Sequence, residues 1–122
     1  MTPQRVFNIL TLTGNSNELE KFRLHAEGID PCVLGRFYLN DFCFNNFIAL
    51  PNAVIQGTSM IEMETSRINV WGCASDALGV SLEESPDKLI YMFTTGKCPP
   101  KKVLDKINLL YGSGLNIVHK TR

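Results

Sequence analysis

The sequence predicts an α+β fold of the ferredoxin-like split βαβ type: a four-stranded antiparallel sheet, two main helices on one face, and an insertion after the first helix. Three observations predict it. A strand pattern over residues 5–13 leads into a helical pattern that reaches about residue 27. Two strand patterns, 77–84 and 88–95, flank a Ser-Pro-Asp turn. A helical pattern after paired prolines and a short strand, 115–118, complete the order.

The composition favours a single domain over residues 1–122. The chain has 12 Lys plus Arg and 12 Asp plus Glu, so its formal net charge is zero, and 44% of its residues are hydrophobic. This apolar content excludes a disordered chain. The balance of charge also argues against a protein that binds nucleic acid mainly through phosphates, because such proteins usually carry a basic excess.

The spacing of the cysteines and the composition of the N-terminus indicate which cofactors and which cellular compartment to expect. The four cysteines lie far apart and form no CxxC pair. Zinc sites usually take ligands from close pairs, so we expect no metal and no cofactor. The N-terminus lacks the apolar stretch of a signal peptide, and no apolar run is long enough to span a membrane. We therefore expect a cytoplasmic protein of the host cell with reduced thiols.

The first unit is a strand followed by a helix. Residues 5–13 are rich in β-branched and other apolar side chains, which is typical of a strand. Asn15 with Glu18 resembles a capping box. Leu19 and Phe22 then lie on one helical face, and Gly28 is suited to end the helix.

The insertion, residues 29–70, is rich in phenylalanine. It contains four of the seven phenylalanines, Phe37, Phe42, Phe44 and Phe47. We expect irregular structure or short strands packed on the domain, and we keep Phe42 and Phe44 as candidate interaction residues. Near its end, Ser59 with Glu62 predicts a capped helix over about 58–70.

The second half predicts strand, strand, helix and strand. In the strand 88–95, Leu89, Tyr91 and Phe93 alternate with Ile90 and Met92. Both faces are therefore apolar, which indicates a central strand. After the prolines, apolar residues recur with a helical period, and glycines end the helix. They are Val103, Leu104, Ile107, Leu110 and Tyr111.

Two segments carry candidate chemistry. Trp71 and Asp76 flank Cys73, which could be a nucleophile if a base lay nearby, but a core role for the tryptophan is more typical. Lys97 and Cys98 precede the last helix, where Lys97 could hold a small anion; the alternative is an ordinary loop. We predict no catalytic residue and keep Trp71, Asp76 and Lys97 as candidate interaction residues.

The neutral total hides an uneven distribution of charge. From residue 97 onward there are six basic residues and one acid, whereas residues 58–87 are mainly acidic. Lys101, Lys102 and Lys106 are therefore candidates for nucleic-acid contact, although a basic helix face is more often only solvated. The strand 89–93 lacks the basic-Gly-aromatic run of RNA-recognition domains, which Tyr91 and Phe93 could mimic only in part.

Several motifs occur in the order of a known family. The chain resembles the Api92-like or YubB-type ferredoxin-like family, found in phages, plasmids and other bacterial mobile elements. The similar segments are Asn8–Gly14 with Asn17–Phe22, Phe47–Pro51, Asn69–Gly72 with Asp76 and Ala77, Phe93–Thr95, and Pro99–Pro100.

The resemblance implies an accessory protein of a virus or plasmid. We expect a noncatalytic phage or mobile-element protein that binds a host protein or protein complex. Its sharpest form is an inhibitor of a host defence system, such as a CRISPR or restriction complex. One alternative is a nucleic-acid-binding module that uses the basic C-terminal helix. The other is a small-ligand binder or enzyme around Trp71, Cys73 and Asp76.

Overall fold

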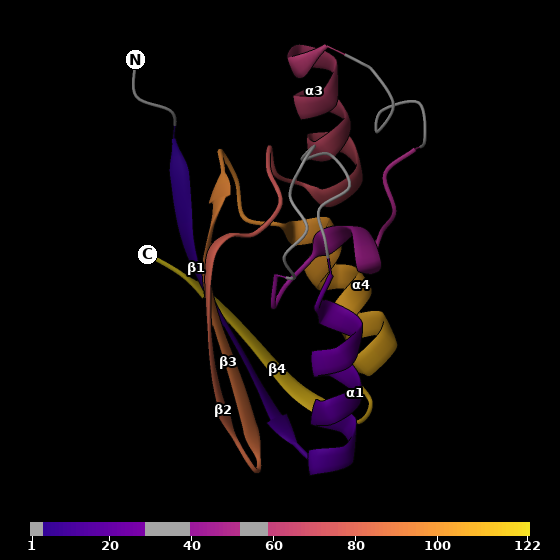
Figure 1. Cartoon of the computed structure of the whole chain (residues 1–122), viewed down its shortest axis with the longest axis vertical. Helices are drawn as coiled ribbons and strands as arrows, with labels where there is room; N and C mark the ends of the chain where they lie inside the picture. The colour runs from indigo at the N-terminus through magenta and orange to yellow at the C-terminus, as the bar shows by residue number, and fades with distance from the viewer. Residues whose placement is uncertain (1–3, 29–39, 52–58) are drawn as a thin grey trace.

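The computed structural model describes residues 4–28, 40–51 and 59–122. In these residues a four-stranded antiparallel sheet, in the order β2-β3-β1-β4, packs against helices (Figure 1). The elements in chain order are β1 (Arg5–Gly14), α1 (Ser16–Ala26), the 3₁₀ turn η1 (Phe44–Asn46), α3 (Met60–Trp71), β2 (Leu78–Ser85), β3 (Lys88–Gly96), α4 (Lys101–Tyr111) and β4 (Leu115–Thr121). The predicted α+β class and the four antiparallel strands are confirmed.

The prediction of two main helices is wrong, because the described residues contain three α-helices. The helix α3 stands between α1 and β2, so the element order is not that of a plain βαββαβ unit. In Figure 1, α1 and α4 lie along one face of the sheet and α3 lies beyond their upper end. The capped helix expected over 58–70 is thus a third helix of the fold.

The two central strands bury alternate side chains. In β1, Asn8, Leu10 and Leu12 face the helices and are fully buried, while the residues between them are half-buried. In β3 the buried set is Leu89, Tyr91, Phe93 and Thr95. Because successive strand residues point to opposite faces, the helices cover one face of the sheet only. The prediction that β3 is a central strand is confirmed, since it lies between β2 and β1.

Helix ends follow the polar residues that the sequence offers. The Oδ1 atom of Asn15 accepts a hydrogen bond from the N–H of Asn17 at 2.8 Å, and Ser59 Oγ accepts one from the N–H of Glu62 at 3.2 Å. These bonds satisfy donors that a helix start otherwise leaves unpaired. Gly72 ends α3 in the left-handed region, with φ 90°. A Cβ there would also lie only 3.1 Å from the backbone nitrogen of Lys101, so the glycine lets α3 meet the start of α4.

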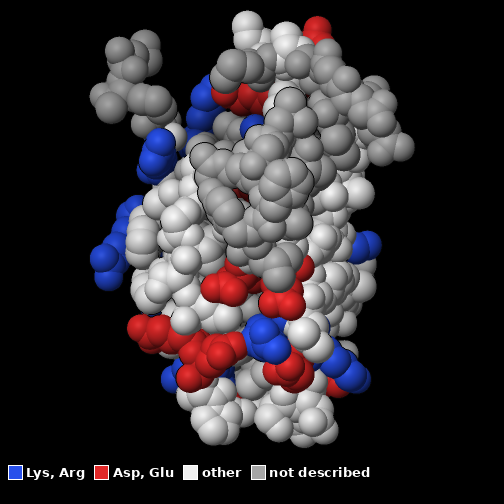
Figure 2. All heavy atoms as spheres, viewed as in Figure 1, with Lys and Arg blue, Asp and Glu red and all other residues white. Residues whose placement is uncertain are grey.

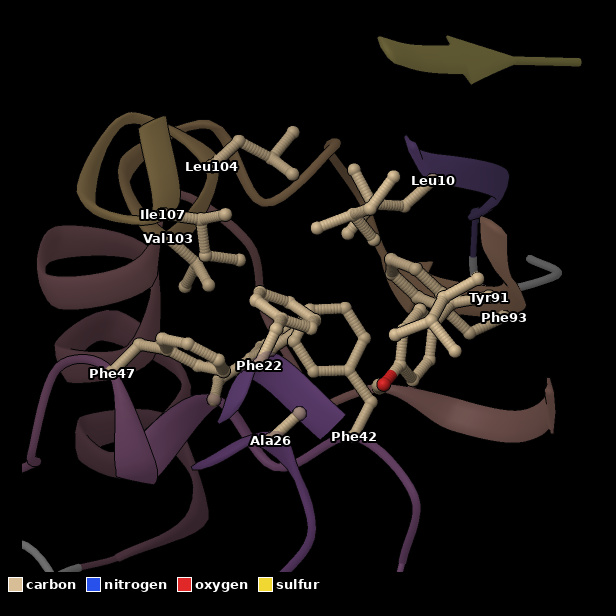
Figure 3. Packing of buried hydrophobic residues seen from close by; sticks show 14 of the residues in the cluster. Leu10, Phe22, Ala26, Phe42, Phe47, Tyr91, Phe93, Val103, Leu104 and Ile107 are labelled. Carbon is tan, nitrogen blue, oxygen red and sulfur yellow. The ribbon is translucent and has the colours of Figure 1, made fainter. Parts of the chain in front are cut away.

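Aromatic rings from the insertion pack into the core beside rings of α1 and β3 (Figure 3). Phe42 meets Phe93 edge to face at 5.1 Å, and Phe44 meets Trp71 in the same way at 5.6 Å. Phe22 stacks on Phe47 at 5.5 Å. The candidate interaction residues Phe42 and Phe44 are 0% exposed, so their side chains fill the core and offer nothing to a partner. Phe37 lies outside the described residues.

No helix in the described part of the chain is long and apolar enough to cross a bilayer.

Candidate functional site

The candidate residues Trp71, Cys73 and Asp76 are buried in the core. Trp71 is 0% exposed, and its Nε1–H donates to the carbonyl oxygen of Ile48 at 2.8 Å. Cys73 is equally buried, and its thiol donates to the carbonyl of Ser75 at 3.1 Å. Burial raises the pKa of Cys73 to about 12, so the thiolate that a nucleophile needs is scarce. These residues therefore pack and do not form an open pocket.

Asp76 joins the insertion to the start of β2. Its Oδ1 atom accepts hydrogen bonds from the backbone N–H of Phe44 at 2.9 Å and from that of Ala77 at 2.7 Å. Its Oδ2 atom accepts a weak bond from the thiol of Cys43 at 3.7 Å. The carboxylate is 5% exposed, so its contacts are structural and a metal or substrate does not reach it from solvent.

Two candidate lysines bind α3. Lys97, with φ 65°, forms an ion pair with Glu64, and its backbone N–H donates to the carbonyl of Gln4 at 3.0 Å. Lys102 Nζ donates to the carbonyl of Asn69 at 2.5 Å. Lys101 is exposed and Lys106 is half-buried. Lys97 and Lys102 thus stabilise the position of α3, whereas Lys101 is open to a ligand.

The face of the sheet turned away from α1 and α4 has an apolar centre. We call it the open sheet face. The strand registers pair Ile9 with Met92, Thr11 with Ile90 and Thr11 with Val118, and these side chains share that face. Val118 is 40% exposed and the others are half-buried. No described helix lies over them (Figure 1).

Basic side chains surround that apolar centre. Strand parity places Arg5, Lys88 and Lys120 on the open sheet face, together with one acid, Glu83 of β2, which pairs with Ile90; all four are exposed. The guanidinium of Arg122 lies 5.2 Å from the centre of the Phe7 ring, a cation–π contact at the upper rim. Figure 2 shows basic atoms along the upper part of the left border, the side of the sheet away from the helices, and acidic atoms at the lower end of that border. The open sheet face therefore has an apolar centre with an excess of basic residues around it, and its single strand carboxylate, Glu83, lies at the β2 border.

Acidic side chains gather instead between α1 and β2. Arg23 donates to Glu20 at 2.7 Å and lies 3.7 Å from Glu27 and 3.4 Å from Glu84. The hydrogen bond from Arg23 lowers the pKa of Glu20, and that from Glu20 raises the pKa of Arg23. One guanidinium among three carboxylates leaves this edge negative. The net charge is therefore zero because acidic residues on one side of the fold balance basic residues on another.

A cavity of about 460 Å³ lies between the start of α4 and β4. Gly72, Cys98, Pro99, Lys101 and Leu104 line it on one side, and His119 and Thr121 of β4 line it on the other. We call it the α4–β4 cavity. Most of its lining is hydrocarbon, and Cys98 is exposed there. The sequence singled out Cys98 but gave no signal that His119, 21 residues later, would share its cavity.

A buried polar network fixes His119. Its Nε2 lies 2.8 Å from Asn8 Oδ1, and Asn8 Nδ2 donates to Thr95 Oγ1 at 3.0 Å and to the carbonyl of Val6 at 3.1 Å. Because the amide nitrogen is used as the donor, His119 Nε2 carries the proton. Burial lowers the pKa of His119, which favours this neutral ring. The ring orientation at the cavity is therefore set by β1.

No family model, curated protein or solved structure matches this chain. Two features of the described residues are accessible to a partner or ligand, the open sheet face and the α4–β4 cavity. The sequence pointed to the first only in part. The alternation of Ile90 and Met92 showed a second apolar face, but which basic residues border it depends on strand order and register.

Proposed function

We propose that this protein is a noncatalytic accessory protein of a phage or other mobile element that binds a host protein through its open sheet face. The sharpest form is inhibition of a host defence system, such as a CRISPR or restriction complex. The observation that carries the binding role is an apolar sheet centre, bordered by exposed basic residues, that no described helix covers. The mobile-element setting comes from the motif resemblance.

The chemistry of the open sheet face favours a protein partner. The side chains at its centre are the aliphatic Ile9 and Ile90 and the thioether Met92. Such side chains adapt to the surface of another protein. The aromatic rings on which an RNA-recognition domain stacks bases are absent from the middle of this face. Tyr91 and Phe93, which could have mimicked them, point into the core and are at most 1% exposed. We infer a partner with an apolar patch and acidic surroundings.

We also infer that the fold derives from the ferredoxin-like split βαβ plan, with α3 as part of the insertion between α1 and β2. The support is the antiparallel pairing and the strand order β2-β3-β1-β4, in which the first and last strands of the chain, β1 and β4, are neighbours. An open sheet face opposite the helix layer follows from such a two-layer arrangement.

A defined defence assay tests the proposal. Bacteria carrying a known CRISPR or restriction complex express the protein, and the plating efficiency of a targeted phage is measured. Met92→Glu places a charge in the centre of the open sheet face, while the matched control Leu24→Glu changes a 54% exposed residue of α1. We expect wild type and Leu24→Glu to raise plating and Met92→Glu to lose the effect.

Binding to the purified complex by calorimetry gives the second readout. A folded Met92→Glu protein that binds and inhibits as well as wild type removes the open sheet face from the proposal. Absence of binding to every defence complex in a panel removes the inhibitor role.

A nucleic-acid-binding role is the second candidate, and one observation favours it. The first turn of α4 has no acidic residue, and Lys101 and Lys102 are exposed there. This role predicts affinity for single-stranded DNA or RNA oligonucleotides that falls steeply with salt. The triple change of Lys101, Lys102 and Lys106 to Glu then abolishes binding. Binding that is absent or insensitive to salt excludes this role.

A further inference from the structure

We propose that the free edge of β4 binds an extended acidic peptide, which adds a fifth strand to the sheet and places an apolar side chain in the α4–β4 cavity. The site lies at the β4 border of the sheet, two strands away from Met92 at the centre of the open sheet face. The order β2-β3-β1-β4 leaves β4 with one neighbour, so one side of its backbone faces no other strand in the described chain. Such an edge is a template for strand addition.

The register shows which backbone groups are available. The N–H of Arg122 donates to the carbonyl of Phe7 at 3.1 Å, so this pair is hydrogen-bonded. In an antiparallel ladder, every second residue pair exchanges such bonds. Val118 and Lys120 therefore bond to β1. The N–H and C=O groups of Ile117, His119 and Thr121 point away from β1, towards the free edge.

The α4–β4 cavity lies beside these same residues. His119 and Thr121 line it from β4, and Leu104 and Pro99 line it from the opposite side. A strand added to this edge sends alternate side chains towards the helix layer, where the cavity can receive one. The ring of His119 is already held by Asn8, so this wall of the cavity needs no rearrangement. The lining chemistry selects an apolar side chain.

The surrounding charge selects an acidic peptide. Lys101 borders the cavity, Lys120 lies on the open sheet face of β4, and Arg122 follows the strand. From residue 97 onward Asp105 is the sole acid in the sequence. Acidic residues that alternate with apolar ones would face Lys120 and Arg122 on the open side while the apolar ones face the cavity, where Lys101 borders the entrance. A second copy of β4 is disfavoured, because it would bring a second set of the same cations to the edge.

The opposite edge of the sheet does not offer this site. β2 has an irregular register between Leu78 and Ser81, and Gly79 lies there with φ 58°. Its other end carries the exposed carboxylates of Glu83 and Glu84. A bulge and edge charges are features that protect a strand from pairing. Strand addition by an acidic peptide is therefore directed to β4.

The experiment selects displayed peptides against the full-length protein. One library alternates acidic with apolar positions, a second alternates basic with apolar positions, and a third has the acidic residues in one block. We expect enrichment from the first library only. Enrichment of basic peptides, of blocked acidic peptides, or of none from any library overturns the proposal.

A matched pair of variants tests the edge. Thr121→Pro removes an N–H that points outward while leaving the ladder to β1 intact, and proline is tolerated on that side of an edge strand. Thr121→Val loses the hydroxyl and keeps the N–H. We expect Thr121→Pro to weaken an enriched peptide roughly tenfold or more, through the lost bond and the ring, with Thr121→Val close to wild type. Equal affinity of both variants contradicts strand addition.

Amide hydrogen exchange distinguishes the N–H groups of β4 that point towards the free edge from those that point towards β1. Bound peptide should slow exchange at Ile117, His119 and Thr121, while Val118 and Lys120 are already protected by β1. Protection without this alternation, or protection located on β2, refutes the site. Met92→Glu should leave peptide affinity unchanged, so failure here and failure of the proposed protein-binding role are distinguished.

Discussion

Removing the carboxylate of Asp76 should destabilise the fold strongly. In Asp76→Ala the backbone N–H groups of Phe44 and Ala77 lose their shared acceptor, Oδ1, in a site that is 5% exposed. A buried donor without a partner costs about 1–3 kcal/mol, so two cost about 2–6 kcal/mol. That is a large fraction of the roughly 5–15 kcal/mol that stabilises an ordinary domain.

Asp76→Asn is the matched control. The amide oxygen can occupy the place of Oδ1 and accept both backbone bonds, so the variant loses the charge and the weak acceptor for the Cys43 thiol, and the cost should be about 1–2 kcal/mol. Urea unfolding followed by circular dichroism measures both variants. If Asp76→Ala unfolds within 1 kcal/mol of wild type, or if both variants lose the same amount, the carboxylate does not hold the insertion in the way argued.

Three further predictions concern ionisable groups and a buried hydroxyl. With a pKa of about 12, Cys73 is about one part in ten thousand thiolate at pH 8, so mass spectrometry after brief alkylation should find Cys98 modified and Cys73 intact. Because burial lowers the pKa of His119, the unfolded chain binds a proton at this residue more readily than the folded chain does. The free energy of unfolding should therefore fall as the pH drops through about 6.5. In urea titrations at several pH values, His119→Gln should make the free energy of unfolding depend less on pH. Tyr91→Phe removes a hydroxyl that has no hydrogen-bond partner among the described residues, so thermal unfolding should show unchanged or slightly higher stability; a loss above about 1 kcal/mol would contradict this.

Local signals account for the parts of the fold that the sequence predicted. The caps at Asn15 and Ser59 form within two or three residues of chain, so their side chains show them directly. The alternation in β3 reports its central position because both faces of a central strand meet other side chains. The last strand, expected over 115–118, continues to Thr121, since pairing with β1 overrides weak strand propensity at its end.

Long-range packing decided what the sequence could not show. The sequence around Phe42 and Phe44 shows no helical or strand periodicity, so it does not tell a core side chain from a surface one. Their burial depends on contacts with Phe93 and Trp71, which come from distant elements. The cap at Ser59 predicts the helix α3 within the insertion, but it does not show that the helix ends in the core. Its last residue, Trp71, is a core residue whose indole bonds to Ile48. The insertion is therefore part of what holds the domain together.

The zero net charge gains a physical meaning once the strands are placed. Arg23 gathers Glu20, Glu27 and Glu84 at one edge, between α1 and β2. Lys120 and the residues around it lie on the far strand, β4, because the sheet order separates β2 from β4 by two strands. A partner with acidic surroundings is attracted to the β4 side and repelled from the β2 side. The separation therefore orients an approaching partner even though the sequence total is neutral, and that orientation should weaken as salt screens it.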